Sequence, residues 1–326
     1  MKVCRLLGRS ALAIFVTLAG ATASTAGERY AMVVTGASGG DAYAQKYDQW
    51  RATFVSTLRE KFGYGADRLR ILAEAESEGV QKATRENVQR VLVELRKRLA
   101  RDDQLLILLV GHGTSLDGED AKFNLVGPDM SAAEWAELLK PLPGRVIFVN
   151  TTGASFPFLQ KLAGRGRVVL TATDSALQQF ETIFPEYFVN AFTDPAADTD
   201  KDDRISLWEA FAFASAGVRQ WFEQKGQLAT ERPLLDDTGG GVGREAINPG
   251  SDGQIAAKTF LEPETAPSLP ADVLIGTLQK RRAELEAQIE ELKARKSSMA
   301  SDQYEADLER LLLELARVVQ QIKAKS

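Results

Sequence analysis

The chain has 326 residues, of which 45 are acidic and 40 are basic, so its formal charge at pH 7 is −5. This mild acidity argues against a general nucleic-acid-binding role, which requires a basic surface. The chain holds one cysteine and one histidine. A single chain therefore cannot form a disulfide framework.

The first 26 residues have the features of a secretory signal peptide. Lys2, Arg5 and Arg9 give a basic start, an apolar stretch runs from 11 to 21, and small residues follow. This stretch is too short to predict a membrane span, and no later segment is long and apolar enough for one. Cleavage would remove Cys4, leaving neither a thiolate metal ligand nor a cysteine nucleophile. We expect a periplasmic or extracellular protein.

From residue 27 to 243 the pattern predicts a single α/β domain. Short apolar runs alternate with segments in which apolar residues recur every three or four positions. Strands and helices that alternate at this spacing favour right-handed βαβ units, a mainly parallel sheet and helices on both of its faces. The predicted strands are 30–34, 69–72, 105–110, 145–150 and 168–171.

The strand at 105–110 leads into the glycine-flanked residue His112, in the sequence LLILLVGHG. The carboxyl ends of strands in open α/β sheets face the ligand crevice. An imidazole with an ordinary pKa of about 6.5 is suited to proton transfer at such a place. The alternative is a loop histidine that merely ends the strand. The strand at 145–150 is followed by TTGAS, residues 151–155, which would lie beside His112 if the two strands are neighbours.

A strand ending in GHG, followed by a strand ending in a small-residue loop, resembles the caspase-like fold and, within it, the legumain-like cysteine peptidases. In that family the histidine of an HG pair and a cysteine at the tip of the next strand form the catalytic dyad. His112 matches the histidine. The position of the cysteine falls on Thr152, within NTTGAS. The resemblance implies a peptidase-like fold and a peptide ligand, with the cysteine nucleophile replaced.

Three functions follow from this replacement, because a threonine hydroxyl needs a strong, aligned base before it can attack a carbonyl. The leading hypothesis is a degenerate peptidase that binds a peptide or protein segment between His112 and Thr152. The second is an active endopeptidase with His112 as base, Thr152 or Ser155 as nucleophile, and Asp129 or Asp174 as orienting carboxylate. The third is a structural calcium-binding scaffold. The hydroxyl residues of the TTGAS loop also suit plain turn and cap roles.

The segment 198–209, DTDKDDRISLWE, has the ligand spacing of an EF-hand calcium loop. Hard oxygen ligands at these positions favour Ca²⁺. Asp203 stands where glycine is usual, and aspartate tolerates the left-handed conformation better than most residues. The alternative is an acidic, solvated turn. The predicted ligands are Asp198, Asp200, Asp202, the carbonyl of Arg204, Ser206 and Glu209.

The last part of the chain predicts a linker and a helical hairpin. Residues 244–270 are rich in Gly, Pro, Ser and Asp and have little periodicity, which is typical of a linker. Residues 271–326 carry two apolar stripes with charged residues between them, which predicts an antiparallel helical hairpin, or coiled coil. A two-helix hairpin buries little surface by itself. We expect it to meet a second copy or a partner helix, the alternative being that it folds back on the main domain.

Overall fold

The computed structural model describes residues 27–116, 118, 120–263, 273–296 and 299–323. The predicted signal peptide, 1–26, lies outside the described residues. The chain divides after Pro263 into a large unit and a small one.

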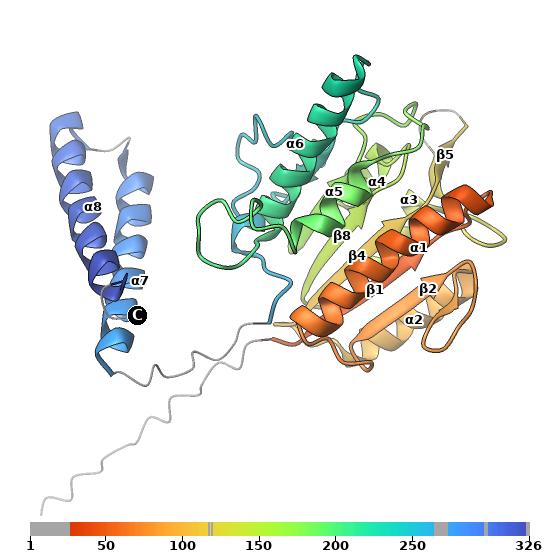
Figure 1. The fold of residues 1–326 in the computed structure, drawn as a ribbon, viewed down its shortest axis with the longest axis horizontal. Helices are drawn as coiled ribbons and strands as arrows, with labels where there is room; N and C mark the ends of the chain where they lie inside the picture. The colour runs from red at the N-terminus through yellow and green to blue at the C-terminus, as the bar shows by residue number, and fades with distance from the viewer. Residues whose placement is uncertain (1–26, 117, 119, 264–272, 297–298, 324–326) are drawn as a thin grey trace, which may run out of the picture. The chain divides into compact units, whose positions relative to one another are not determined.

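The large unit contains a seven-stranded sheet in the order β10-β9-β8-β4-β1-β2-β3, in which the paired strands are parallel except for the β10–β9 pair (Figure 1). This confirms the predicted α/β fold class and its mainly parallel sheet. The strands are β1 (Arg29–Thr35), β2 (Leu69–Ala73), β3 (Gln81–Lys82), β4 (Gln104–Val110), β8 (Arg145–Asn150), β9 (Arg167–Thr171) and β10 (Leu234–Asp236).

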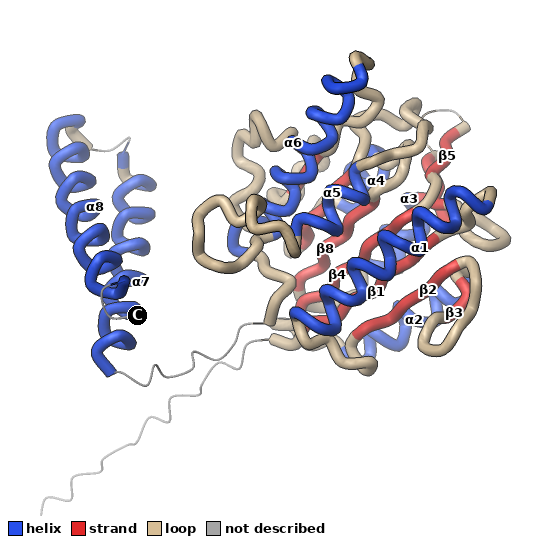
Figure 2. Tube along the Cα trace, in the orientation of Figure 1, coloured by secondary structure: helices blue, strands red, loops and turns tan. Residues whose placement is uncertain are grey.

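Helices cover both faces of this sheet, so that it separates two hydrophobic cores (Figure 2). Each core is built from the alternate residues of the central strands, because successive strand side chains point to opposite faces. One face holds α1 (Asp41–Ser56), which continues as a π-helical turn η1 (Thr57–Lys61), together with α5 (Phe184–Ala191) and α6 (Leu207–Lys225). The other holds α2 (Arg85–Arg98), α3 (Ala132–Leu139) and α4 (Phe156–Leu162).

Side-chain hydrogen bonds cap the first turns of two helices that cover the sheet. Thr84 accepts from the Asn87 backbone N–H at the start of α2. Ser131 and Glu134 form a reciprocal capping box at the start of α3. Such caps satisfy backbone N–H groups that have no partner within the helix.

A second, three-stranded antiparallel sheet follows β4 directly. It contains β5 (Gly113–Ser115), β6 (Ala121–Phe123) and β7 (Met130–Ser131), in that order. Because β5 begins one residue after His112, this small sheet extends from the carboxyl edge of the large sheet.

The prediction of a linker over 244–270 is wrong for residues 244–263, which pack on the large unit. The buried carboxylate of Asp237 accepts hydrogen bonds from the backbone N–H groups of Gly253, Ile255 and Ala256 at 2.8–3.0 Å. Asp252 in turn accepts from the N–H of Asp237 at 3.1 Å. Side-chain carboxylates thus bond backbone N–H groups that a helix or strand would otherwise satisfy. The segment is therefore ordered although its sequence shows no helix or strand periodicity. A 3₁₀ turn, η2 (Ala256–Lys258), lies in this segment. Residues 264–270 lie outside the described residues.

The small unit is a pair of helices, α7 (Val273–Ala294) and α8 (Ser301–Lys323). Their contact is compatible with the predicted coiled coil. The buried residues of the pair are Leu285, Ile289, Leu292, Leu311 and Val318. In the described part of the chain, none of the helices combines the length and the apolar character needed to cross a membrane.

Candidate functional site

The sheet brings the two predicted strand tips together. β4 pairs with β8 from Gln104↔Arg145 to Leu109↔Asn150, and the Thr151 N–H donates to the Leu109 carbonyl at 3.1 Å. His112 and the TTGAS loop therefore follow adjacent strands at one edge of the sheet, the adjacency on which the predicted dyad depends.

The imidazole of His112 is held by α1 and by the glycine-rich turn at residues 36–40, which follows β1. Its Nε2 lies 3.0 Å from the Ser38 carbonyl oxygen and 3.1 Å from the Tyr47 hydroxyl. Since a carbonyl only accepts, Nε2 carries a hydrogen in the first contact. The ring of Tyr43 packs edge-on against the imidazole, with centroids 4.8 Å apart. Burial, and then Glu181 and Tyr43, raise the pKa of the Tyr47 phenol above its ordinary range. Tyr47 is therefore a neutral partner that fixes the ring.

The Thr152 hydroxyl is buried and is engaged away from His112. Its Oγ1 lies 2.8 Å from Asn150 Oδ1 and 2.9 Å from the Gly153 carbonyl oxygen. A Cβ added to Gly113 would lie 2.5 Å from the same Oγ1 and 2.1 Å from the Gly153 oxygen. The two strand tips are thus in direct contact, and only a glycine fits at position 113.

Ser155 links the tips of β8 and β9. Its buried Oγ accepts hydrogen bonds from the backbone N–H groups of Ala172 and Thr173, each at 3.1 Å, and lies 3.0 Å from Thr173 Oγ1. These bonds satisfy N–H groups at the end of a parallel strand. They give Ser155 a structural role.

Among the described residues no hydrogen bond joins His112 to either hydroxyl. The two carboxylates predicted to orient the histidine are also engaged elsewhere. Asp129 accepts from the Leu125 N–H at 3.0 Å, and Asp174 pairs with Arg232 at 3.1 Å. The described structure therefore does not assemble the Thr/His or Ser/His dyad.

A loop between β9 and α5, residues 172–183, closes over the tip of β8; we call it the covering loop. The Ala154 N–H donates to the Gln178 carbonyl at 2.7 Å, and the Thr182 hydroxyl donates to the Thr151 carbonyl at 2.5 Å. Glu181 of this loop also forms an ion pair with Lys46 of α1. These contacts bury the hydroxyls beneath it.

Exposed apolar side chains surround this closed tip. Leu177 and Phe180 of the covering loop are 74% and 67% exposed, and Leu116, just after β5, is 96% exposed. The Gln179 amide joins the two segments, because Nε2 donates to the Ser115 carbonyl at 2.7 Å and Oε1 accepts from the Ser115 N–H at 3.3 Å. Large apolar side chains held out into solvent by an anchored frame are typical of an interaction surface. We call these three residues the apolar rim.

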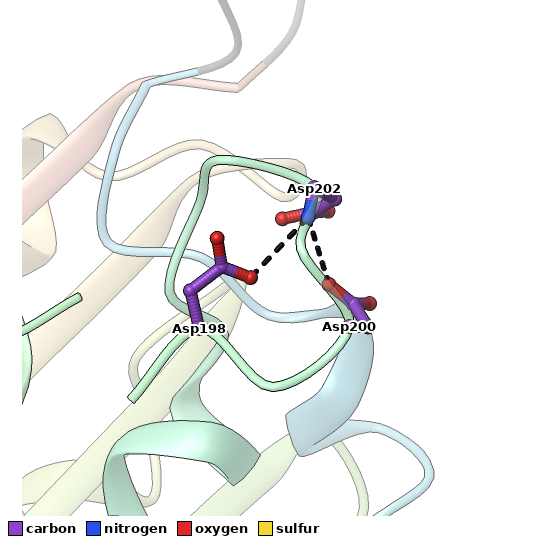
Figure 3. Close-up of side chains that lie close together, drawn as sticks. All are labelled: Asp198, Asp200 and Asp202. Atoms are coloured by element: carbon purple, nitrogen blue, oxygen red, sulfur yellow. Dashed lines mark hydrogen bonds between the residues drawn. The ribbon is translucent and has the colours of Figure 1, made fainter. Parts of the chain in front are cut away.

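Three of the predicted calcium ligands, Asp198, Asp200 and Asp202, converge, as Figure 3 shows. One carboxylate oxygen from each lies within 4.8 Å of the others. The Asp202 N–H contacts both Asp198 Oδ1 and Asp200 Oδ1 at 3.2 Å, which closes the turn. Burial, followed by the charges of Asp202 and Glu209, raises the pKa of Asp200. Lys201 and Asp203 both have positive φ, 59° and 66°, so Asp203 adopts the left-handed conformation in place of the usual glycine.

Glu209 and Ser206 have a capping role in this structure. Ser206 Oγ accepts from the Glu209 N–H at 3.2 Å, and Glu209 Oε2 accepts from the Ser206 N–H at 2.9 Å, a capping box for α6. Glu209 Oε1 also accepts from the N–H of Thr199 at 2.8 Å. Burial opposes ionisation of Glu209, but the hydrogen bonds from Ser206 and Thr199 outweigh it and lower the pKa. Glu209 thus ties the start of the loop to the helix that leaves it.

The donor set fits a hard divalent cation. Three convergent carboxylates provide hard oxygen atoms, which suit Ca²⁺. The Arg204 N–H donates to Asp202 Oδ1 at 2.9 Å, so the chain at Arg204 is already turned around this group. Ser206 and Glu209, which the spacing also predicts as ligands, form the α6 capping box in this structure, and Glu209 also bonds the Thr199 N–H.

A separate cavity of about 360 Å³ lies between α6 and the segments 229–233 and 245–247. Its lining includes Glu231, which is buried and accepts from the N–H groups of Ile183 and Phe184 at 2.7 and 2.9 Å, at the start of α5. Burial raises the pKa of Glu231 to about 7, although these two hydrogen bonds, which favour the charged carboxylate, act to lower it.

Several of these residues carried no signal in the sequence. The covering loop has no periodicity, and the pairing of Gln179 with Ser115 depends on two segments 64 residues apart. Glu231 belongs to a polar stretch that gave no hint of burial. The Ser206–Glu209 capping box was detectable, because its S-x-x-E pattern precedes an apolar helix.

The comparisons with known proteins leave the family open. No protein-family model matches the chain, and no curated protein matches it either. Among solved structures, the chain is similar to that of protein GSU0716 from Geobacter sulfurreducens, with a TM-score of 0.42 and 13% sequence identity. The match covers 64% of this chain and 92% of the other.

Because the pKa of Glu231 is raised, we expect the free energy of unfolding to fall as the pH rises. Because its folded pKa, about 7, lies above the ordinary 4.5, its contribution to stability is complete below pH 4.5 and is lost as the pH rises through 7. Relative to Glu231→Gln, the wild-type free energy of unfolding should fall by about 2 to 3 kcal/mol from pH 5 to pH 8. Urea unfolding at each pH measures this.

The control is Glu245→Gln, which removes the same charge from a partly exposed position on the same cavity. It should follow the wild-type pH dependence. Parallel wild-type and Glu231→Gln curves would contradict the assignment.

Proposed function

We propose that this chain is a degenerate relative of the legumain-like peptidases, a calcium-stabilised domain that binds a peptide or protein segment without cleaving it. The observation that carries the proposal is the state of Thr152. Its hydroxyl is fully buried and bound to Asn150, whereas the imidazole of His112 is bound to Ser38 and Tyr47. A hydroxyl without a base in reach is a poor nucleophile.

The apolar rim supports a binding role. Leu116, Leu177 and Phe180 project from two segments that Gln179 holds together, so an incoming chain would not have to order them first. Pre-ordered contacts lower the entropic cost of binding. The preferred ligand is a peptide or protein segment with apolar side chains, bound over the covering loop and not between the strand tips.

Calcium would be held by Asp198, Asp200, Asp202 and the carbonyl of Arg204. The ion supplies positive charge that offsets the repulsion among three carboxylates. Glu209 fixes the loop to α6, whose buried residues belong to the core beside α1 and α5. Calcium would therefore stabilise the packing of α6 on the sheet. With the signal-like sequence at 1–26, we infer a periplasmic or extracellular location.

A second role, self-association, is favoured by one face of α8. Leu312 and Leu313 are 48% and 53% exposed, and with Leu308, Glu305 and Glu309 they line a shallow apolar groove. Leu311 and Val318 of the same helix are instead buried in the core that the helical pair forms. We propose that a second copy of the chain covers this groove, since helix pairs gain stability by burying such a stripe.

The first test concerns binding and cleavage at the apolar rim. The full chain, with calcium, is mixed with a peptide library and examined by mass spectrometry, then titrated with an enriched peptide by fluorescence anisotropy. We expect retained peptides and no cleavage, and we expect Phe180→Ser to weaken binding about tenfold, the loss of about 1.4 kcal/mol that one buried aromatic contact explains. Leu228→Ser, at a position 92% exposed outside the rim, is the control.

Cleavage that disappears in His112→Ala would contradict the proposal and favour the active endopeptidase. Thr152→Cys is expected to show no turnover, because position 152 is covered. Equal binding by Phe180→Ser and by the wild type would place the peptide elsewhere.

The second test concerns calcium. Titration calorimetry of the full chain should detect one Ca²⁺ site, and calcium at 100 times its Kd should add about 2.7 kcal/mol to the free energy of unfolding. Asp200→Asn should abolish most of both effects. Asp203→Asn is the matched control, because it removes one charge from the same loop at a left-handed position that asparagine tolerates. A heat of binding unchanged in Asp200→Asn would exclude this loop as the site.

The third test concerns the groove on α8. Sedimentation of the full chain should show a concentration-dependent oligomer, and the double variant Leu312→Ser/Leu313→Ser should be monomeric, because a seam without its leucines buries too little apolar area. Leu228→Ser again controls for loss of an exposed leucine. A wild-type chain that stays monomeric would refute self-association.

A further inference from the structure

Residues 259–262 form a short strap that runs between the calcium loop and the sheet. On the loop side, the Leu207 N–H donates to the Thr259 carbonyl at 2.8 Å, and Ser206 and Phe260 form an antiparallel bridge. The guanidinium of Arg204 lies 3.8 Å above the centre of the Phe260 ring. The strap therefore contacts residues 204–207, the part of the loop that leads into α6.

On its other side the strap is fixed to the amino ends of the central strands. Its Phe260 carbonyl accepts from Arg29 Nε at 3.2 Å and from Gln104 Nε2 at 3.0 Å. These residues begin β1 and β4. Arg145, the first residue of β8, donates to Thr259 Oγ1 at 3.1 Å.

The strap is buried as well as bonded. Thr259 and Leu261 are almost wholly inaccessible, and the Tyr64 hydroxyl donates to the Leu261 carbonyl at 2.9 Å. Glu262 adds an ion pair to Arg204, with 3.5 Å between Oε2 and Nε. One short segment thus connects the calcium loop to three strands and to the helix-covered core.

We propose that the strap and calcium bind cooperatively, so that the docked strap completes the calcium site and calcium in turn holds the strap closed. The inference rests on the proposed calcium binding. Its physical basis is Arg204, whose backbone carbonyl is a proposed calcium ligand and whose side chain stacks on Phe260. The strap fixes the Arg204 side chain and the nearby backbone at Leu207. It therefore reduces the conformational entropy that the loop loses when calcium binds.

Linkage makes the inference quantitative. If the docked strap raises calcium affinity by some factor, calcium must favour the docked strap by the same factor. One measurement on the ion and one on the strap therefore have to agree. The strap immediately precedes the residues that join the two units, so calcium would fix the point at which that connection leaves the large unit.

Two measurements on the full chain test this. Hydrogen exchange of the segment 256–263 is compared in Ca²⁺ and in a calcium chelator, and calcium affinity is measured by calorimetry for Phe260→Ala and for Arg204→Lys. We expect calcium to slow exchange in the strap about tenfold, and each variant to bind calcium about tenfold more weakly, within the usual range of coupling. Arg204→Lys keeps the charge and the backbone carbonyl but loses the planar stack.

The control is Ile255→Ala, just before the strap and 41% exposed, which should bind calcium as the wild type does. If Phe260→Ala fails to fold, Phe260→Leu and Arg204→Lys carry the test. Calcium binding by the wild type with unchanged strap exchange and unchanged affinities in the variants would overturn the cooperativity alone. No calcium binding by the wild type would overturn the proposed calcium site together with it.

Discussion

The parallel pairing of β4 with β1 on one side and β8 on the other is the constraint on which the rest of the large unit depends. All seven residues of β4 are buried, and its pairing with β1 runs along its whole length, from Gln104 to Val110. Because parallel strands end at a common edge, this pairing places His112 beside Thr151–Ser155 and leaves the starts of the strands at the opposite edge. The covered strand tips and the strap with the predicted calcium loop lie at these opposite ends of the same strands.

At the carboxyl edge, the same adjacency that could align a nucleophile with a base is used for structure. A buried hydroxyl costs free energy unless it is hydrogen-bonded, and Thr152 and Ser155 each meet that requirement with partners on their own or the neighbouring strand tip. The imidazole of His112 likewise packs against Tyr43 and Tyr47 and bonds the Ser38 carbonyl oxygen. Satisfied hydrogen bonds of this kind oppose catalysis, because a nucleophile and a base must be free to exchange a proton with each other.

The sequence was sufficient for the regular parts of the fold. Apolar patterns located the central strands and indicated helices between them, because this signal is local. Cap residues such as Thr84 and Ser131 are local signals of the same kind, since each bonds a backbone N–H three residues later. It failed for 244–263, where polarity suggested a linker. There the chain is held by Asp237 and Asp252, whose partners are backbone N–H groups, and any sequence can supply those. For the site, the sequence predicted that the TTGAS loop lies beside His112 if their strands are neighbours, which they are. The hydrogen-bond partners of these residues were not predicted, because they depend on long-range contacts such as that of Tyr47 with His112.

The strap explains why so polar a segment orders on the sheet. Phe260 and Leu261 are among the few large apolar residues of the segment 244–263. Phe260 stacks on Arg204, and Leu261 is buried in the core. Oxygen atoms of the strap accept hydrogen bonds from three side chains at the amino edge of the sheet, those of Arg29, Gln104 and Arg145. These bonds replace the hydrogen bonds to water that the oxygen atoms lose on burial. The calcium loop is thus bounded by two rigid elements, α6 through the Ser206–Glu209 capping box and the sheet through the strap. If the loop binds calcium as proposed, these attachments reduce the entropy that ordering it would cost.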